Sequence, residues 1–343
     1  MWWRVRGFGM TLAAPFPYFG GKRRAAPAIW DALGDPGGYV EPFAGSAAVL
    51  LARPSVDGRR VETLNDADGW LINAWRAIRL SPDEVAHHAA GPVAEVDYHA
   101  RLAWLQERRS PELVSWLEGD PEAHDPQAAA WWLYVAACGI GDPWGGGPWR
   151  VVDGHLTRRE RGPGDSPGVN KKLPHLGNAG QGIHRALPHL GDAGQVHEAQ
   201  LTLYMRQLAG RLERVRLTCG SWERVVKPSA YRAKTGGDGS IAILLDPPYS
   251  TSGGLYAEGC DSGEVSAAVR EWCLTAPSEL RIVLCGYDRE HDALLDEGWR
   301  VEQGQGGGGA GYSVNRENGR RERLWMSPAC ASQSSLFDLG EAA

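Results

Sequence analysis

The sequence predicts an α/β fold in which helices cover both faces of a mostly parallel sheet. Apolar segments of strand length alternate with amphipathic segments of helical length, which is typical of repeated βα units. One apolar segment, residues 241–245 (IAILL), is an uninterrupted run, as expected of a strand buried on both faces. At 343 residues, the chain is long enough for one large α/β domain with an insertion.

The first two βα units are expected early in the chain. Residues 39–43 (YVEPF) predict a strand, which a glycine turn and the helical run AAVLLAR follow. Residues 61–65 (VETLN) predict the next strand, with a turn at 66–68 and the amphipathic helix GWLINAWRAIR. Ligands of such folds bind beyond the carboxyl ends of the strands, so the two turns are candidate binding segments.

The middle of the chain interrupts this pattern. Residues 82–138 are helical in character, with Trp, Leu and Ala at helical spacing. Residues 139–200 are rich in Gly, Pro, His and Arg and contain an imperfect repeat, LPHLGNAGQGIH at 173–184 and LPHLGDAGQVH at 187–197. Two copies are too few for a solenoid and favour paired loops or a hairpin.

The α/β pattern returns after residue 198. We expect strands at 215–219 (VRLTC), 241–245 and 281–287 (RIVLCGY), late strands near 299–302 and 323–326, and helices near 198–212, around 264–274 and through Leu295. The sequence therefore predicts a discontinuous sheet domain at 14–80 and 200–328, an inserted, partly helical region at 81–199, and a flexible tail at 329–343.

Cysteine and histidine usage favours neither a disulfide framework nor a metal site. The six cysteines lie far apart without a C-x-x-C pair, which fits a reducing compartment. The histidines of the repeat lack Asp, Glu or Cys at ligand spacing. No apolar run reaches the length of a signal peptide or a membrane span. We therefore expect a soluble, cytoplasmic protein that holds no metal and does not insert into a membrane.

Charge is distributed unevenly along the chain. The net charge is −6, but residues 150–234 carry fifteen Lys and Arg against seven Asp and Glu, which makes that stretch +8 and the remainder −14. A basic segment inserted into an acidic enzyme body suits contact with nucleic-acid phosphates. A solvated arginine-rich loop without a partner would have the same composition.

The tetrapeptide Asp246-Pro247-Pro248-Tyr249 directly follows the apolar strand 241–245. Two prolines end the strand and fix the turn, so a carboxylate, a proline carbonyl and an aromatic ring are expected at the carboxyl edge of the sheet. Two acceptors can hold the N–H bonds of an amino group conjugated to a nucleobase while it attacks an electrophilic methyl. The ring can stack on a base taken out of a duplex.

A second motif, residues 41–47 (EPFAGSA), lies at the first strand-to-helix turn. Its Gly45 allows close approach of the backbone to a ligand, and Asp66, twenty-one residues later, ends the second strand where an acid can accept ribose hydroxyls. The pair predicts a nucleoside-shaped ligand without separating S-adenosylmethionine from a nicotinamide or a flavin. Residues 16–22 (FPYFGGK) can place a ring and a cation against a carboxylate-bearing ligand, or form a plain loop.

FPYFGGK, YVEPFAGSAAVL, LNDADGWLINAWRAI and LLDPPYS, in this order, resemble the Dam-like DNA adenine-N6 methyltransferases. The resemblance covers about residues 16–78 and 215–287. It implies a Rossmann-like, S-adenosylmethionine-dependent methyltransferase sheet with an inserted target-recognition domain. The expected reaction is site-specific transfer of a methyl group to adenine N6 in double-stranded DNA, after base flipping, by direct in-line transfer.

The resemblance also implies roles for individual residues. Tyr18 and Lys22 would help to hold the cofactor, with Lys22 near its methionine end, while Phe43, Ala44 and Gly45 would form the floor of the cofactor site. The complete set of expected cofactor-binding residues is Tyr18, Gly21, Lys22, Glu41, Phe43, Ala44, Gly45, Asp66, Ser221, Trp222 and Asp246. The expected catalytic residues are Asp246, Pro247, Pro248 and Tyr249.

Two positions depart from the pattern of the family. Ala47 stands where the family has the second glycine of its first motif, which narrows the turn. Ser221 and Trp222 follow the strand 215–219, where the family usually has an acid and then an aromatic residue. Ser221 can still donate or accept a hydrogen bond with the cofactor adenine.

DNA contacts are expected in the basic insertion. The candidates for phosphate contacts are Arg158, Arg159, Arg161, Lys171 and Lys172. Phosphate contacts position a protein on DNA but do not read its sequence. A cognate restriction nuclease is a possible partner by the habit of the family, and the sequence indicates neither the recognised site nor the oligomeric state.

Other functions remain open at this point. An N4-cytosine methyltransferase would use the same geometry, although aspartate at position 246 favours adenine. RNA or protein methylation would use similar chemistry. A nicotinamide oxidoreductase would leave the DPPY segment unexplained. A non-catalytic DNA-binding module with a vestigial cofactor site is expected to have lost Asp246 or Asp66, and both are present.

Overall fold

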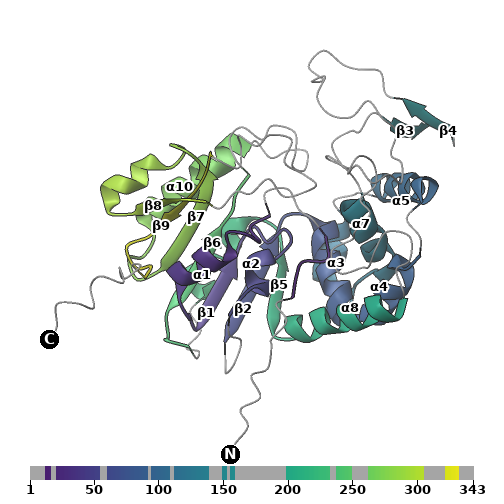
Figure 1. Cartoon of the computed structure of the whole chain (residues 1–343), viewed down its shortest axis with the longest axis horizontal. Helices are drawn as coiled ribbons and strands as arrows, with labels where there is room; N and C mark the ends of the chain where they lie inside the picture. Colours follow the sequence, from purple (N-terminus) through teal and green to yellow (C-terminus); the bar gives the residue numbers. More distant parts are fainter. Residues whose placement is uncertain are drawn as a thin grey trace, which may run out of the picture.

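The computed structural model describes residues 12–16, 21–54, 60–91, 94–108, 112–138, 149–152, 155–158, 198–231, 237–248, 262–304 and 321–331. These residues form a seven-stranded sheet, helices that flank it, and a separate two-stranded hairpin (Figure 1). The predicted α/β class is confirmed.

The large sheet is mostly parallel. Its strands are β1 (Gly38–Glu41), β2 (Val61–Asp66), β5 (Val215–Cys219), β6 (Ile241–Leu245), β7 (Arg281–Tyr287), β8 (Arg300–Gln303) and β9 (Glu322–Met326). They lie in the order β5-β2-β1-β6-β7-β9-β8, and every neighbouring pair from β5 to β7 is parallel. Strand β9 runs antiparallel to both β7 and β8. The carboxyl ends of the five parallel strands therefore meet at one edge of the sheet.

Helices cover both faces of the sheet, as predicted. The covering helices include α1 (Ala26–Leu33), α2 (Ala48–Leu51), α3 (Gly69–Leu80) and α10 (Ser262–Thr275). Ile29 of α1 and Trp75 of α3 are buried in the core on one face. Val269 of α10 is buried with Ile243 and Leu284 on the other face. Burial of both faces explains the uninterrupted apolar sequence of β6.

A group of helices lies beside the β5 edge of the sheet (Figure 1). It consists of α4 (Pro82–Ala89), α5 (Glu95–Glu107), α6 (Glu112–Gly119), α7 (Pro126–Cys138) and α8 (Glu198–Leu212), packed with α3. The helical character predicted for residues 82–138 is thus confirmed. Strands β3 (Trp149–Val152) and β4 (His155–Arg158) form an antiparallel hairpin that contacts α5 and that we did not predict. The repeat at 173–197 lies outside the described residues.

Three local elements differ from the sequence-based expectation. Strand β1 ends at Glu41 rather than Phe43, because Pro42 has no N–H to continue the ladder. Helix α1 was not predicted; a proline stands in its first turn, where the missing N–H has no intrahelical partner in any case. The helix expected through Leu295 is the 3-10 helix η2 (Asp292–Glu297), which Gly298 ends with a φ of 77°.

The remaining short elements lie between β5 and β6. They are the 3-10 helix η1 (Trp222–Arg224) and α9 (Pro228–Tyr231). None of the helices in the described ranges is long and apolar enough to cross a membrane. The His, Cys, Asp and Glu side chains of these ranges form no group of three that could hold a metal ion.

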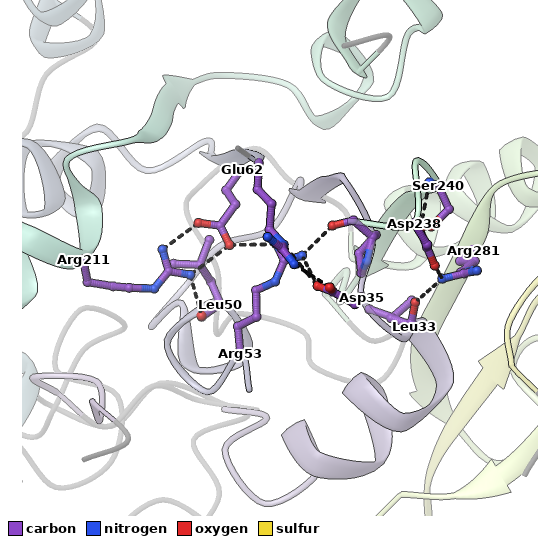
Figure 2. Close-up of polar contacts among 11 residues, drawn as sticks. Leu33, Asp35, Leu50, Arg53, Glu62, Arg211, Asp238, Ser240 and Arg281 are labelled. Carbon is purple, nitrogen blue, oxygen red and sulfur yellow. Dashed lines mark hydrogen bonds and ion pairs between the residues drawn. The ribbon is translucent and has the colours of Figure 1, made fainter. Parts of the chain in front are cut away.

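The amino ends of the parallel strands are tied together by arginine–carboxylate contacts (Figure 2). Glu62 of β2 accepts hydrogen bonds from Arg53 and Arg211, and Arg281 of β7 pairs with Asp238, just before β6. These contacts fix the edge of the sheet that lies opposite the candidate site.

Candidate functional site

The predicted binding segments follow three neighbouring strands of the sheet. Asp66 is the last residue of β2, the glycine turn follows β1, and Asp246 follows β6. Because β2, β1 and β6 are adjacent and parallel, the three segments lie side by side at the carboxyl edge. The structure therefore brings together the two motifs that the sequence separates by about two hundred residues.

The turn after β1 is held in a tight, left-handed conformation. Gly45 and Ala47 have φ values of 45° and 50°. The Ala44 N–H donates to the Asn65 carbonyl at 2.8 Å, and the Trp75 indole N–H donates to the Gly45 carbonyl at 3.1 Å. Ala47 thus occupies a backbone conformation that glycine adopts more easily, at the position where the family has its second glycine.

The Asp66 carboxylate anchors this turn. Its Oδ2 accepts the Gly45 N–H at 3.0 Å, and its Oδ1 accepts the Asp68 N–H at 3.0 Å. Burial raises the pKa of Asp66 to about 6, even though both hydrogen bonds act in the opposite direction. Each carboxylate oxygen has acceptor capacity beyond these bonds, so Asp66 can also accept a ligand hydroxyl.

Asn65 connects the turn to the end of β5. Its side-chain amide donates to the carbonyls of Pro42 and Gly220 at 3.0 and 2.9 Å, and its Oδ1 accepts the Thr218 hydroxyl at 2.9 Å. Asn65 is fully buried, so these bonds replace its contacts with water. The segment after β5 is therefore placed directly beside the glycine turn.

Two aromatic rings line the same part of the edge. The rings of Phe43, after β1, and Trp222, after β5, lie 6.2 Å apart between centroids with an interplanar angle of 29°. Ser221, just before Trp222, is exposed. Nearly parallel rings next to a carboxylate suit a ligand that carries a planar base and a sugar.

Glu41 acts inside the protein rather than at its surface. Its side chain is buried, and Oε1 accepts the Tyr39 hydroxyl and the Leu50 N–H, each at 2.7 Å. Burial raises the pKa of Glu41 to about 8, against the effect of these two hydrogen bonds. The contacts fix α2 onto β1 and so support the glycine turn between them.

Asp246 is paired with a buried lysine. The Lys22 ammonium lies 2.9 Å from Asp246 Oδ1, and the Lys22 side chain is 5% exposed against 21% for Asp246. The Lys22 carbonyl accepts the N–H of Ala26, the first residue of α1. Burial alone would lower the pKa of Lys22, but the neighbouring acids, Asp246 foremost, together outweigh it and raise the pKa above its usual value. Lys22 is therefore a charged group that holds the carboxylate of the DPPY segment in place.

Comparison with known families agrees with this geometry. Residues 18–96 match the family model of the D12 class N6 adenine-specific DNA methyltransferases. The match agrees with the expected family over this part of the chain. The match includes Lys22, the glycine turn, Asp66 and the start of the helical group, and it ends before the DPPY segment. No curated protein gives a match to the chain. The D12 family implies a methyltransferase that acts on adenine in DNA.

Most of the residues predicted for a D12-type site lie within the described parts of the chain. The structure places the following residues at the carboxyl edge of the sheet or in its support: Gly21, Lys22, Glu41, Phe43, Ala44, Gly45, Asp66, Ser221, Trp222, Asp246, Pro247 and Pro248. Tyr18, Tyr249, Arg159, Arg161, Lys171 and Lys172 lie outside the described residues, and the backbone of Arg158 is described in β4 without its side chain. Lys22, expected at the methionine end of the cofactor, contacts Asp246.

Sequence reasoning missed the groups that β7 and β9 contribute. Cys285 and Tyr287 of β7 and Glu322 of β9 lie near enough to Lys22 or Asp246 to interact electrostatically with one or both. No motif marks these residues in the sequence. Their proximity to Asp246 depends on the pairing of β6 with β7 and of β7 with β9.

Proposed function

We propose that the chain transfers a methyl group from S-adenosylmethionine to N6 of adenine in double-stranded DNA. The observation that carries the proposal is the position of Asp246. Its carboxylate lies at the end of β6, directly beside β1, whose glycine turn is anchored by Asp66 of β2. A nucleoside-type cofactor site and an amino-binding carboxylate therefore share one edge of the sheet, as the D12 match leads one to expect.

The residues at the turn suit S-adenosylmethionine. Asp66 can accept the ribose hydroxyls, and the rings of Phe43 and Trp222 offer flat apolar faces to an adenine. Gly45 lets the backbone approach the ligand without a side chain in the way. The cofactor, when bound, supplies an electrophilic methyl group.

The DPPY segment provides the acceptors that a weak nucleophile needs. The lone pair of an adenine amino group is delocalised into the ring, so positive charge grows on nitrogen as it attacks the methyl. Asp246 and the Pro247 carbonyl would accept the two N–H bonds and stabilise that charge. Lys22 holds Asp246 in a fixed orientation, which lowers the reorganisation needed at the moment of transfer. Tyr249, outside the described residues, would stack on the flipped base.

We assign DNA recognition to the insertion at residues 81–199. The helices α4 to α7 and the β3–β4 hairpin belong to it, and the hairpin contains Arg150 and ends at Arg158. The match to the D12 family model ends within this insertion, at residue 96. Arg158, Arg159, Arg161, Lys171 and Lys172 are proposed phosphate contacts, which would make binding weaken as salt concentration rises. A cognate restriction nuclease remains a proposed partner.

The direct test is incubation with methyl-labelled S-adenosylmethionine and unmethylated genomic DNA, followed by digestion to nucleosides and mass analysis. Genomic DNA is chosen because it samples most short recognition sites. N6-methyladenine is the expected product. N4-methylcytosine would retain the mechanism and replace the base, whereas label absent from DNA, together with demonstrated cofactor binding, would refute the DNA reaction.

A matched pair of variants tests the role of Asp246. Asp246→Asn keeps the shape of the side chain and removes its charge, and it should lower the rate of methyl transfer by at least about 100-fold. Cofactor affinity, measured by calorimetry, should change little. Asp296→Asn, in the exposed part of η2, is the control and should behave as the wild type. Loss of cofactor binding together with transfer in Asp246→Asn would contradict the assignment.

A further inference from the structure

The contact between Lys22 and Asp246 raises an electrostatic problem for the proposed reaction. A carboxylate and an ammonium 2.9 Å apart form a pair without net charge. Positive charge on the attacking nitrogen is stabilised best by a site with net negative charge. Moreover, Lys22 contacts Oδ1 of Asp246, one of the two carboxylate oxygens that could accept the target amino group. An additional acid near Lys22 would resolve both difficulties.

The pairing of strands places Glu322 in that position. Leu245 pairs with Leu284, so Asp246 follows one residue later, beside Cys285. Tyr287, the last residue of β7, pairs with Glu322, the first residue of β9. Because β9 is antiparallel to β7, its first residue lies at the same carboxyl edge as Asp246.

Glu322 also lies on the same face of the sheet as Lys22. Side chains two positions apart on a strand share a face, so Glu322 shares one with Leu324. Leu324 is buried in the core that includes Ile29 and Trp30 of α1, the helix that Lys22 precedes. Glu322 is half-buried, which keeps its charge from being fully screened by water.

Other acids near Lys22 and Asp246 do not supply this charge at neutral pH. The Cys285 thiol has electrostatic contacts with Lys22 and Asp246, but burial raises its pKa well above the usual value and keeps it neutral. Glu41 interacts with Asp246, and burial raises its pKa to about 8. The pKa of Glu322 is raised as well, by burial first and also by Asp246, while Lys22 acts on that carboxyl in the opposite direction and favours its ionised form.

We propose that Glu322 is a positioning residue for methyl transfer. Its carboxylate shares the Lys22 ammonium with Asp246, gives the three-residue cluster a net negative charge, and weakens the hold of Lys22 on Asp246 Oδ1, so that this oxygen can accept the target amino group. This inference rests on the proposed function, because it concerns the same site. The inference gives β9 a part in the reaction. Strand β9 lies outside both sequence motifs and outside the residues that match the family model.

The first experiment compares single-turnover methyl transfer in wild type, Glu322→Gln and Glu322→Asp, with saturating cofactor and DNA. Glu322→Gln keeps the shape and removes the charge, so the transfer rate should fall about 10-fold to 100-fold, with cofactor affinity within about twofold of the wild type. Glu322→Asp keeps the charge and should be faster than Glu322→Gln. Glu302→Gln, on the neighbouring strand β8, is the control and should transfer at the wild-type rate.

The second experiment does not depend on activity. Urea unfolding of wild type, Lys22→Met, Glu322→Gln and the double variant gives the coupling between the two side chains. We expect Glu322→Gln to shift the urea midpoint of unfolding in the wild-type background. In the Lys22→Met background, the same substitution should shift the midpoint by a smaller amount or in the opposite direction. Additive shifts would overturn the proposed contact.

The outcomes separate this inference from the proposed function. If the wild type methylates adenine and Glu322→Gln transfers at an unchanged rate, Glu322 has no part in the reaction and the inference fails alone. If the wild type does not methylate DNA, the proposed function fails, and the unfolding cycle still reports whether Glu322 and Lys22 interact. Equal losses of rate and cofactor affinity in Glu322→Gln would indicate a merely structural role and would also overturn the inference.

Discussion

The carboxyl groups at the two edges of the sheet have opposite electrostatic surroundings. At the amino edge, acids are paired with arginines and two of them have lowered pKa values. At the carboxyl edge, Glu41, Asp66 and Glu322 are buried or half-buried and have raised pKa values. The same sheet thus has one edge where arginines favour the charged form of the carboxyl groups and one where burial favours the neutral form of these three.

The centre of the amino edge is Glu62 (Figure 2). Arg211 binds both of its oxygens, at 2.6 and 2.9 Å, and Arg53 donates to Oε1 at 3.0 Å. Arg211 also donates to the Leu50 carbonyl at 2.9 Å. Bidentate pairing of this kind satisfies a buried carboxylate and connects β2 to α8 and to the end of α2.

Asp35 and Asp238 extend this edge to both sides of β1. Hydrogen bonds from Arg60 lower the pKa of Asp35, and Arg53 adds a weaker contact at 3.3 Å. Burial alone would raise the pKa of Asp238, but hydrogen bonds from Ser240 and Arg281 outweigh it and lower the pKa. Each carboxylate is stabilised in its charged form by the fold itself, so none needs a ligand.

Within the described ranges, no arginine pairs with Asp66 or Glu41 at the carboxyl edge. Asp66 is held by two backbone N–H groups, and Glu41 by a hydroxyl and a backbone N–H. Their burial without a cation costs stability when they ionise. That pattern is typical of functional sites, where groups are arranged for a ligand rather than for the fold.

The sharpest test of this comparison uses two acids of one strand, and the larger effect is expected at Glu62. Glu62→Gln removes the charge that pairs with Arg53 and Arg211, whose side chains are 1% and 11% exposed. Breaking a buried pair from one side should lower the free energy of unfolding by about 3 kcal/mol. Urea denaturation measures this loss. Cofactor affinity of the folded variant should remain at the wild-type value, and a loss of affinity would show that the two edges are not independent.

Asp66→Asn is the matched variant at the other end of β2. The amide lacks the charge and one of the two acceptor oxygens of the carboxylate, so cofactor binding should weaken by about 10-fold to 100-fold, while the free energy of unfolding stays within about 1 kcal/mol of the wild type. Because the pKa of Asp66 is about 6, wild-type affinity should fall as the pH is lowered through about 6. The variant should lack this pH dependence. Calorimetric titrations at several pH values measure this dependence of cofactor affinity. A wild-type affinity that does not change between about pH 5 and 7 would exclude an ionised Asp66 as the ribose acceptor.

The sequence predicted the parallel strands well. IAILL, RIVLCGY and VRLTC became β6, β7 and β5 with unchanged bounds, because each is a segment of strand length in which apolar residues predominate between turn residues. Gly45, Asp66 and Asp246 follow strand ends that are visible in the sequence. The parallel topology then brings them to one edge.

Features that depend on the pairing of distant segments could not be predicted. Lys22 and Asp246 are 2.9 Å apart, yet nothing local to either residue indicates the other. Glu322 reaches the site only because β9 inserts antiparallel between β7 and β8. The Arg53, Glu62 and Arg211 network likewise joins residues from three separate elements, and each looks like an ordinary surface charge in the sequence.

Glu41 offers the smallest and most selective test. Its folded-state pKa of about 8 lies above the usual carboxyl value of 4.5, so the folded protein holds a proton that the unfolded chain releases. The free energy of unfolding should therefore be unaffected by this group below about pH 4.5, fall as the pH rises from there, and level off above about pH 8. Each pH unit within that window is worth at most about 1.4 kcal/mol.

Glu41→Gln removes this dependence while it keeps an acceptor for the Tyr39 hydroxyl and the Leu50 N–H. Relative to the wild type, the variant should gain about 1–2 kcal/mol in free energy of unfolding between pH 6 and pH 8, measured by urea denaturation at each pH. Glu62→Gln should show no such gain, since Glu62 is paired with arginines. If the difference between Glu41→Gln and wild type is independent of pH, Glu41 is ionised in the folded protein, and its burial does not keep it protonated.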